Sequence, residues 1–259
     1  MRALAIVLAV VALVIAAALV ALSFAPASLA SRAVARASGG ALALADAEGS
    51  LADGRARIVD AAHRVSVPIA WRLDRTALAN GTLRVDLGRG AGDPVRGTLR
   101  VTRTTLALDD ADITVPAALV GAWLPPPLHL TLGGDLHMTT SALRVGPHGD
   151  GTAEVRWTPA RAADASAQAI DFGTVTATIA SSGPALSATL ASTGGDTAVG
   201  GTLGANERGA SIDVTLTPRD ATPSPLLRAI ASFGAPAPGG GTRFATRYVI
   251  RDVAPFLRR

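Results

Sequence analysis

Long stretches of the chain alternate between apolar and polar residues. Apolar residues that would share one face of a strand occur in the runs Val65/Val67/Ile69/Trp71/Leu73, Leu83/Val85/Leu87, Leu99/Val101, Ala153/Val155/Trp157, Val175/Ala177/Ile179 and Ile212/Val214/Leu216. A period of two is typical of strands with one buried and one solvated face. Glycine-rich segments between the runs, such as residues 88–90 and 194–196, are typical of turns. From residue 46 onward the pattern predicts about ten strands, mainly antiparallel.

Helical patterns are short and few. Ser224 and Pro225 supply an N-cap and a first helical residue for a helix that ends before Gly234, and residues 115–124 predict a second short helix. Because two short helices cannot cover about ten strands, the apolar face is expected to close on itself or to bind something. The predicted fold class is all-β, a curled sheet or a sandwich with one or two short helices, preceded by a single N-terminal transmembrane helix.

The N-terminal residues 3–24 carry no charge and are almost entirely Ala, Val, Leu and Ile. As a helix they would be about 33 Å long, enough to cross the hydrocarbon core of a bilayer. A cleavable signal peptide is the alternative, but its apolar core is usually shorter, and Pro26 lies inside the cleavage motif. We therefore expect a transmembrane anchor at residues 1–25, a linker at 26–45 with a helical pattern at 31–37, and a β-rich domain at 46–259.

The arginines near the apolar segment bear on its orientation. Arg2 precedes the segment, whereas Arg32 and Arg36 follow it closely, which mildly opposes a cytoplasmic N-terminus. Long exported domains, however, translocate largely regardless of such charges. If the body is exported, the N-terminus stays in the cytoplasm, and the charges alone do not decide between the two orientations.

The composition excludes several classes of function. Hydrophobic residues make up 49% of the chain, aromatic residues only 3%, and cysteine is absent, which excludes disulfides and cysteine-based catalysis or metal binding. All 24 basic residues are arginine, which excludes Schiff-base chemistry on lysine. The net charge is only +4 and the arginines are scattered singly, so nucleic acid is not an expected partner.

Few residues could carry chemistry. His129 and His137 lie in neighbouring predicted strands and could face each other as metal ligands, which is the basis of an alternative hypothesis, a hydrolase. Asp109, Asp110 and Asp112 lack the spacing of a calcium loop and are expected in a solvated turn. We assign no catalytic, cofactor-binding or metal-binding residue, and we expect a protein that is not an enzyme.

The three tryptophans divide into two kinds. Trp71 and Trp157 fall on apolar strand faces and are expected in the core. Trp123 precedes three consecutive prolines and is expected at the surface. It is the candidate partner-contact residue.

Short segments of the chain match a known family in their order and spacing. They are Gly49–Ala56, Trp71–Leu73, Asn80–Leu83, Gly151–Trp157, Phe172–Val175, Gly200–Leu203, Leu216–Asp220, Pro225–Leu227 and Phe233–Gly234. Over about Gly49 to Arg251 the chain resembles the type II secretion system protein N family, also called general secretion pathway protein N. It departs from the family at Ala52, where Trp is usual, and at Phe172, where Leu is usual, both of which are packing positions.

The resemblance implies an accessory inner-membrane component of a type II secretion system. We accordingly expect a single-pass protein of the inner membrane, with a cytoplasmic N-terminus and the β-rich domain at residues 46–259 in the periplasm. Such a component acts by protein–protein interaction in the export of folded proteins across the outer membrane, with other secretion subunits as its partners. The resemblance supplies no catalytic residue and no cofactor. The unfilled apolar face suggests an alternative function, a groove-shaped periplasmic protein that handles lipid.

Overall fold

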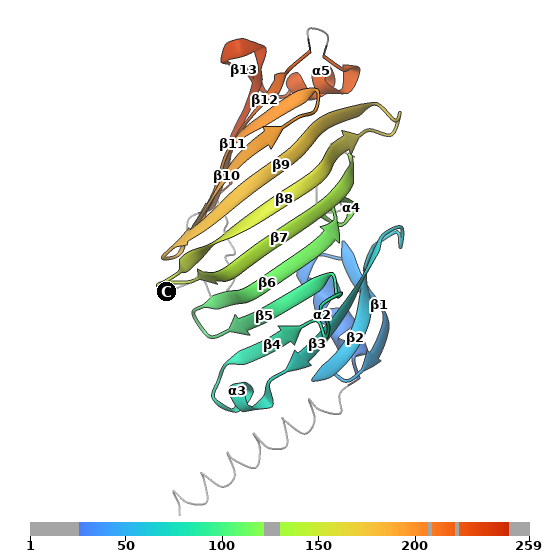
Figure 1. Ribbon diagram of the computed structural model, residues 1–259, viewed down its shortest axis with the longest axis vertical. Coiled ribbons are helices and arrows are strands. Elements are labelled where there is room, and N and C mark those ends of the chain that lie inside the picture. The colour runs from blue at the N-terminus through green and yellow to red at the C-terminus, as the bar shows by residue number, and fades with distance from the viewer. Residues whose placement is uncertain (1–25, 122–129, 207–208, 221–222, 249–259) are drawn as a thin grey trace, which may run out of the picture.

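The body of the protein is one continuous β-sheet. The computed structural model describes residues 26–121, 130–206, 209–220 and 223–248. These residues form a 14-stranded sheet in which each strand pairs antiparallel with the next in sequence, except that β14 lies between β12 and β13. Figure 1 shows that the sheet forms a single, strongly twisted layer. Of the two predicted architectures, the curled sheet is the one observed.

The strands are longest in the middle of the sheet. Their bounds are β1 (Leu42–Gly49), β2 (Asp53–Asp60), β3 (Ser66–Leu73), β4 (Leu83–Leu87), β5 (Val95–Val101), β6 (Leu106–Pro116), β7 (Thr131–Val145), β8 (Asp150–Ala163), β9 (Ala169–Ser182), β10 (Ala185–Thr193), β11 (Thr197–Asn206), β12 (Gly209–Pro218), β13 (Ala235–Pro236) and β14 (Thr242–Tyr248). The helices are α2 (Ser28–Ala37), α3 (Arg75–Ala79), α4 (Ala117–Gly121), α5 (Pro225–Ala231) and the 3₁₀ turn η1 (Pro238–Gly240).

The predicted alternation is confirmed, but the sheet has more strands than about ten. On β3, Val67, Trp71 and Leu73 are buried while Pro68 and Arg72 are exposed. Strands such as β2 were missed because their inward positions are filled by small residues, including Ala56, so the hydrophobic period is weak. Strand β1 begins at Leu42, inside the segment that the sequence assigns to a linker.

The helices are also more numerous than the predicted one or two. The predicted C-terminal helix is present as α5, where the Ser224 hydroxyl accepts a hydrogen bond from the Leu227 backbone N–H at 3.2 Å. Helix α3 was not predicted, because five residues are too few to display a period. Its N-cap is Asp74, whose carboxylate accepts from the N–H groups of Thr76 and Ala77. Within the described ranges no helix is long and apolar enough to cross a membrane, and the predicted anchor at residues 3–24 lies outside them.

Three helices cover separate parts of the apolar face of the sheet. At the N-terminal end, Ser31 of α2 donates to the Leu44 carbonyl of β1 at 3.0 Å. In the middle, Leu119 of α4 packs with Val67 and Val95. At the C-terminal end, Leu226 and Leu227 of α5 pack on a cluster that β8 and β9 contribute, with buried members Ala160, Ala162, Ile170, Phe172 and Val175. The core is therefore divided into patches along one face.

Bulges keep the apolar residues of the long strands on that face. On β8 the buried residues change from an odd position, Ala153, to even positions, Ala160 and Ala162. On β9 they change from Phe172 to Val175. Between these buried residues the β8–β9 register shifts, because each of the two strands contains one extra residue there. The extra residue reverses which positions of the strand, odd or even, face the apolar side of the sheet.

The bulge on β9 requires glycine at residue 173. Gly173 has a φ of 71°, and a Cβ there would clash with the Thr193 carbonyl oxygen and with the backbone of Gly194. Gly92, in the turn between β4 and β5, has no other atom within 4 Å of the position of a Cβ and is a matched control.

We predict that Gly173→Ala lowers the free energy of unfolding by about 1–3 kcal/mol, because it combines backbone strain with a steric clash. Gly92→Ala should change it by less than about 0.5 kcal/mol. Urea denaturation of the full-length protein, followed by tryptophan fluorescence, measures both. Equal stability of the two variants would contradict the bulge at this position.

Candidate functional sites on the two faces of the sheet

The polar face carries a series of arginine–carboxylate pairs. The pairs are Arg55–Glu48, Arg72–Asp53, Arg84–Asp86, Arg96–Asp112, Arg100–Asp109, Arg144–Asp150, Arg156–Glu154, Arg161–Asp171 and Arg243–Asp213. Most members are well exposed, and such pairs contribute only about 0–1 kcal/mol each. They fill the solvated side of the sheet with charges that largely compensate one another.

The cluster of Asp109, Asp110 and Asp112 lies in the middle of β6, so the predicted solvated turn is wrong. Here a bulge between β5 and β6 interrupts the ladder, and Asp110 occupies it with a φ of 47°. Asp109 is buried and accepts a hydrogen bond from Nε of Arg100 at 2.8 Å. Asp109 and Asp112 therefore pair with arginines, whereas Asp110 is exposed to solvent.

Asp112 has both a histidine and an arginine as partners. Its carboxylate contacts Nε2 of His137 at 2.9 Å and also pairs with Arg96. The hydrogen bond to His137 lowers the pKa of Asp112, burial opposes this, and the bond to Arg96 adds to the lowering. His137, one of the two candidate metal ligands, thus has a carboxylate neighbour, while His129 lies outside the described residues. Among the residues that the structure describes, no group of three or more potential ligands could hold a metal ion.

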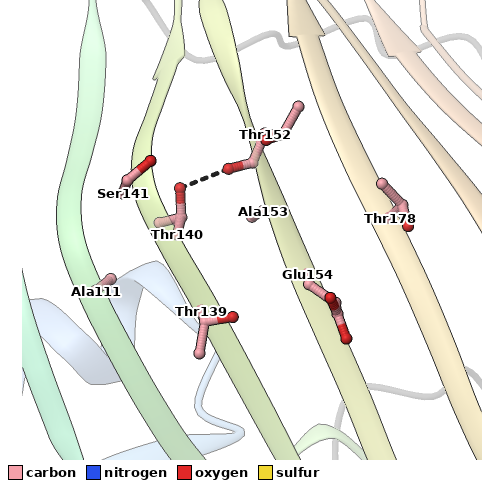
Figure 2. Close-up of a pocket in the computed structure, with 8 residues that line it drawn as sticks. All are labelled: Ala111, Thr139, Thr140, Ser141, Thr152, Ala153, Glu154 and Thr178. Carbon is pink, nitrogen blue, oxygen red and sulfur yellow. Dashed lines mark hydrogen bonds between the residues drawn. The ribbon is translucent and has the colours of Figure 1, made fainter.

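A shallow depression of about 360 Å³ lies on β7 and β8, at the bulge between Thr139 and Ala142 (Figure 2). It is lined by Ala111, Thr139, Thr140, Ser141, Thr152, Ala153, Glu154 and Thr178. The Thr140 hydroxyl donates to the Thr152 carbonyl at 2.6 Å, and Glu154 pairs with Arg156 at 3.1 Å. These lining residues offer hydroxyl groups but no base directed at them, so the depression lacks the arrangement of an activated nucleophile.

A second cavity, of about 490 Å³, lies on the apolar face at the N-terminal end of the sheet. Every lining residue is apolar: Val34, Leu42, Leu44, Leu51, Ile58, Ile69, Trp71, Leu73, Leu78, Leu83, Val85 and Leu87. They come from α2, α3, strands β1–β4 and the β1–β2 turn. We call this cavity the apolar pocket.

Trp71 is the only aromatic residue among those that line the apolar pocket. Its ring lies so close to Gly54 on the neighbouring strand that a Cβ at that residue would overlap the ring. The indole N–H donates to the Leu51 carbonyl at 3.0 Å, so its polar atom is already satisfied. Trp157 is similar, with its N–H donating to the Gly133 carbonyl at 2.7 Å. Both are core residues as predicted, whereas Trp123, the candidate partner contact, lies outside the described residues.

The turn between β2 and β3, next to the apolar pocket, is organised by Asp60. This carboxylate is buried and accepts hydrogen bonds from the N–H groups of Arg64 at 2.6 Å and Val65 at 3.0 Å. Burial by itself raises the pKa of Asp60. The hydrogen bonds from Val65 and Arg64 and the ion pair with the Arg64 side chain lower it by more, so the pKa of Asp60 is lowered overall.

Residues 40–245 match the model of a protein family described as type II secretion system (T2SS), protein N. The chain belongs to this family. The matched range begins just before β1 and ends within β14, so it covers nearly the whole sheet. No curated protein and no solved structure matches the chain.

Membership in the T2SS protein N family makes this chain a component of type II secretion, placed in the cell envelope. Members of the family are secretion components and are not known as enzymes. The two positions where the chain departs from the family pattern, Ala52 and Phe172, are both buried, and Phe172 stacks at a tilt on Trp157 with ring centroids 5.9 Å apart.

We predict that Asp60→Asn destabilises the protein by about 1–3 kcal/mol at neutral pH, because the charged acceptor of the turn is lost. Since the pKa of Asp60 is lowered by folding, its contribution is present above the unfolded value of about 3.9 and disappears as pH falls through the lower folded value. The difference between variant and wild type should therefore vanish in strong acid.

Urea denaturation at a series of pH values measures this difference. Asp110→Asn is the matched control, because Asp110 is exposed in the bulge of β6. This substitution should change the free energy of unfolding by less than about 0.5 kcal/mol. A loss at Asp60→Asn that stays constant down to strong acid would contradict the assigned role of the carboxylate.

Proposed function

We propose that this protein is an accessory inner-membrane component of a type II secretion system, which acts by protein–protein interaction in the export of folded proteins across the outer membrane. The observation that carries the proposal is the family match over residues 40–245.

The proposed arrangement has residues 3–24 as the membrane anchor, the N-terminus in the cytoplasm and residues 46–259 in the periplasm. It is supported by the uncharged run at residues 3–24 and by the direct connection of the described body to that run at Pro26. The proposed partners are other secretion subunits, and Trp123 is the proposed contact residue, because a large aromatic side chain beside three prolines is suited to an interface.

We predict that a photo-crosslinking amino acid at position 123 forms adducts with another secretion subunit in cells that secrete actively. The same amino acid at Arg103, exposed in the turn between β5 and β6, is the control and should give far fewer adducts. Mass spectrometry of the adducts identifies the partner. The proposal would be abandoned if position 123 formed no such adduct and deletion of the protein left secretion unchanged.

We predict that alkaline phosphatase fused to the C-terminus is active in whole cells, because the enzyme folds productively only outside the cytoplasm. A fusion after residue 2, before the apolar segment, is the control and should be inactive. An inactive C-terminal fusion that also resists proteolysis in spheroplasts would reverse the proposed topology.

A further inference from the structure

We propose that the apolar pocket between α2 and strands β1–β4 binds one acyl chain of a membrane phospholipid. The proposal rests on the proposed membrane anchor at residues 3–24 and on the chemistry of the pocket, but not on the role in secretion.

The lining of the pocket accepts only hydrocarbon. All of its residues are apolar, and the one polar side-chain atom among them, the Trp71 indole N–H, already donates to the Leu51 carbonyl. The volume of about 490 Å³ is in the range of small-molecule sites, which is about 300–1,000 Å³. Water inside would find no hydrogen-bonding partner. The occupant is therefore expected to be an apolar chain without polar atoms.

A protein segment fits this pocket poorly. A peptide would bring backbone N–H and C=O groups that need partners, and the edge of β1 that could supply them is covered by α2. The Ser31 hydroxyl donates to the Leu44 carbonyl, and the Ser38 hydroxyl both donates to the Leu42 carbonyl and accepts from its N–H, at 3.0–3.2 Å. Strand addition at this edge is blocked, whereas an acyl chain makes no such demand.

The pocket lies where the chain would leave the bilayer. Pro26 forms a β-bridge with Ser50, and the Ala27 N–H donates to the Gly49 carbonyl at 3.3 Å. Ala27 is buried against Trp71 in the same hydrophobic cluster. Residues 3–24, the proposed anchor, end just before this attachment point, so the pocket is within a few residues of the membrane surface.

Exposed charges on the helix that contributes to the pocket favour a phospholipid. Val34 of α2 lines the pocket, whereas Arg32 and Arg36, two positions to either side, are exposed and lie on the opposite face of the helix. Neither arginine forms an ion pair within the described part of the chain. Guanidinium groups bind phosphate oxygens well, so an amphipathic helix in this position can hold headgroups while the pocket holds a chain.

The test uses the full-length protein in phosphatidylethanolamine–phosphatidylglycerol vesicles that contain a phospholipid with a photoactivatable group at the end of one acyl chain. After irradiation, peptide mapping should find label in residues 42–87 as well as in residues 3–24. Leu83→Asp places a carboxylate at the mouth of the pocket and should reduce the label in 42–87 roughly tenfold. Leu83 is 38% exposed, so the substitution is tolerable for folding.

Ile212→Asp is the matched control, because Ile212 is 36% exposed on the apolar side of β12, at the other end of the sheet. It should leave the label in 42–87 unchanged, and the label in 3–24 should be equal in both variants. Absence of label from 42–87 in the wild type, or an equal loss in both variants, would overturn the proposal.

A second measurement uses the wild-type protein and so does not depend on the folding of a variant. Unlabelled phosphatidylglycerols with progressively longer acyl chains, compared at equal free monomer concentration in water, should compete about fourfold better per added methylene until the pocket is filled, because each methylene then passes from water into the pocket. Competition independent of chain length would refute the site. Protein adducts instead of lipid adducts from a photo-crosslinker at position 83 would assign the pocket to a protein segment, against the proposal.

Discussion

The structure depends on the burial of one face of a single sheet. Each square ångström of apolar surface removed from water contributes about 25 cal/mol, and a strand with alternating residues has all of its apolar surface on one side. In a sandwich a second sheet covers that side. Here the sheet is one layer, and α2, α4 and α5 each cover a part of it. Everything else in the fold serves to keep the apolar side chains on the side where the helices lie.

That constraint explains the bulges of the central strands. A strand of fourteen residues such as β8 twists considerably along its length, and a strict alternation would not follow the covered face. The inserted residues correct this, with Ala153 before the bulge and Ala160 and Ala162 after it all buried. On β6 the same device places Asp110 in the bulge, which is why three aspartates can lie in the middle of a strand.

The strands could be predicted because alternation is a local property of the sequence. The bulges were also visible in principle: apolar positions change from odd at Trp157 to even at Ala160 with Pro159 between them, and Gly173 separates Phe172 from Val175. The apolar pocket could not be predicted residue by residue. Its lining comes from segments between residues 34 and 87, and only the pairing of β1–β4 and the position of α2 bring them together.

The two faces of the sheet differ in their chemistry. The polar face is covered with arginine–carboxylate pairs, such as Arg100–Asp109 and Arg243–Asp213, and its shallow depression presents hydroxyl groups. The apolar face is covered by helices at its ends and middle, and it opens into a hydrocarbon-lined pocket next to the attachment point at Pro26. A protein contact on one face and a lipid contact on the other are compatible in one molecule.

The reversal of alternation on β8 is tested most directly by cysteine labelling, because the chain contains no cysteine. Single cysteines at positions 153, 160 and 162 should be protected from a membrane-impermeant maleimide, and those at 154, 156 and 161 should react quickly. The account predicts that the protected positions change from odd to even across residues 157–160. A pattern that stays protected at odd positions throughout would contradict the bulge, and with it the single covered face.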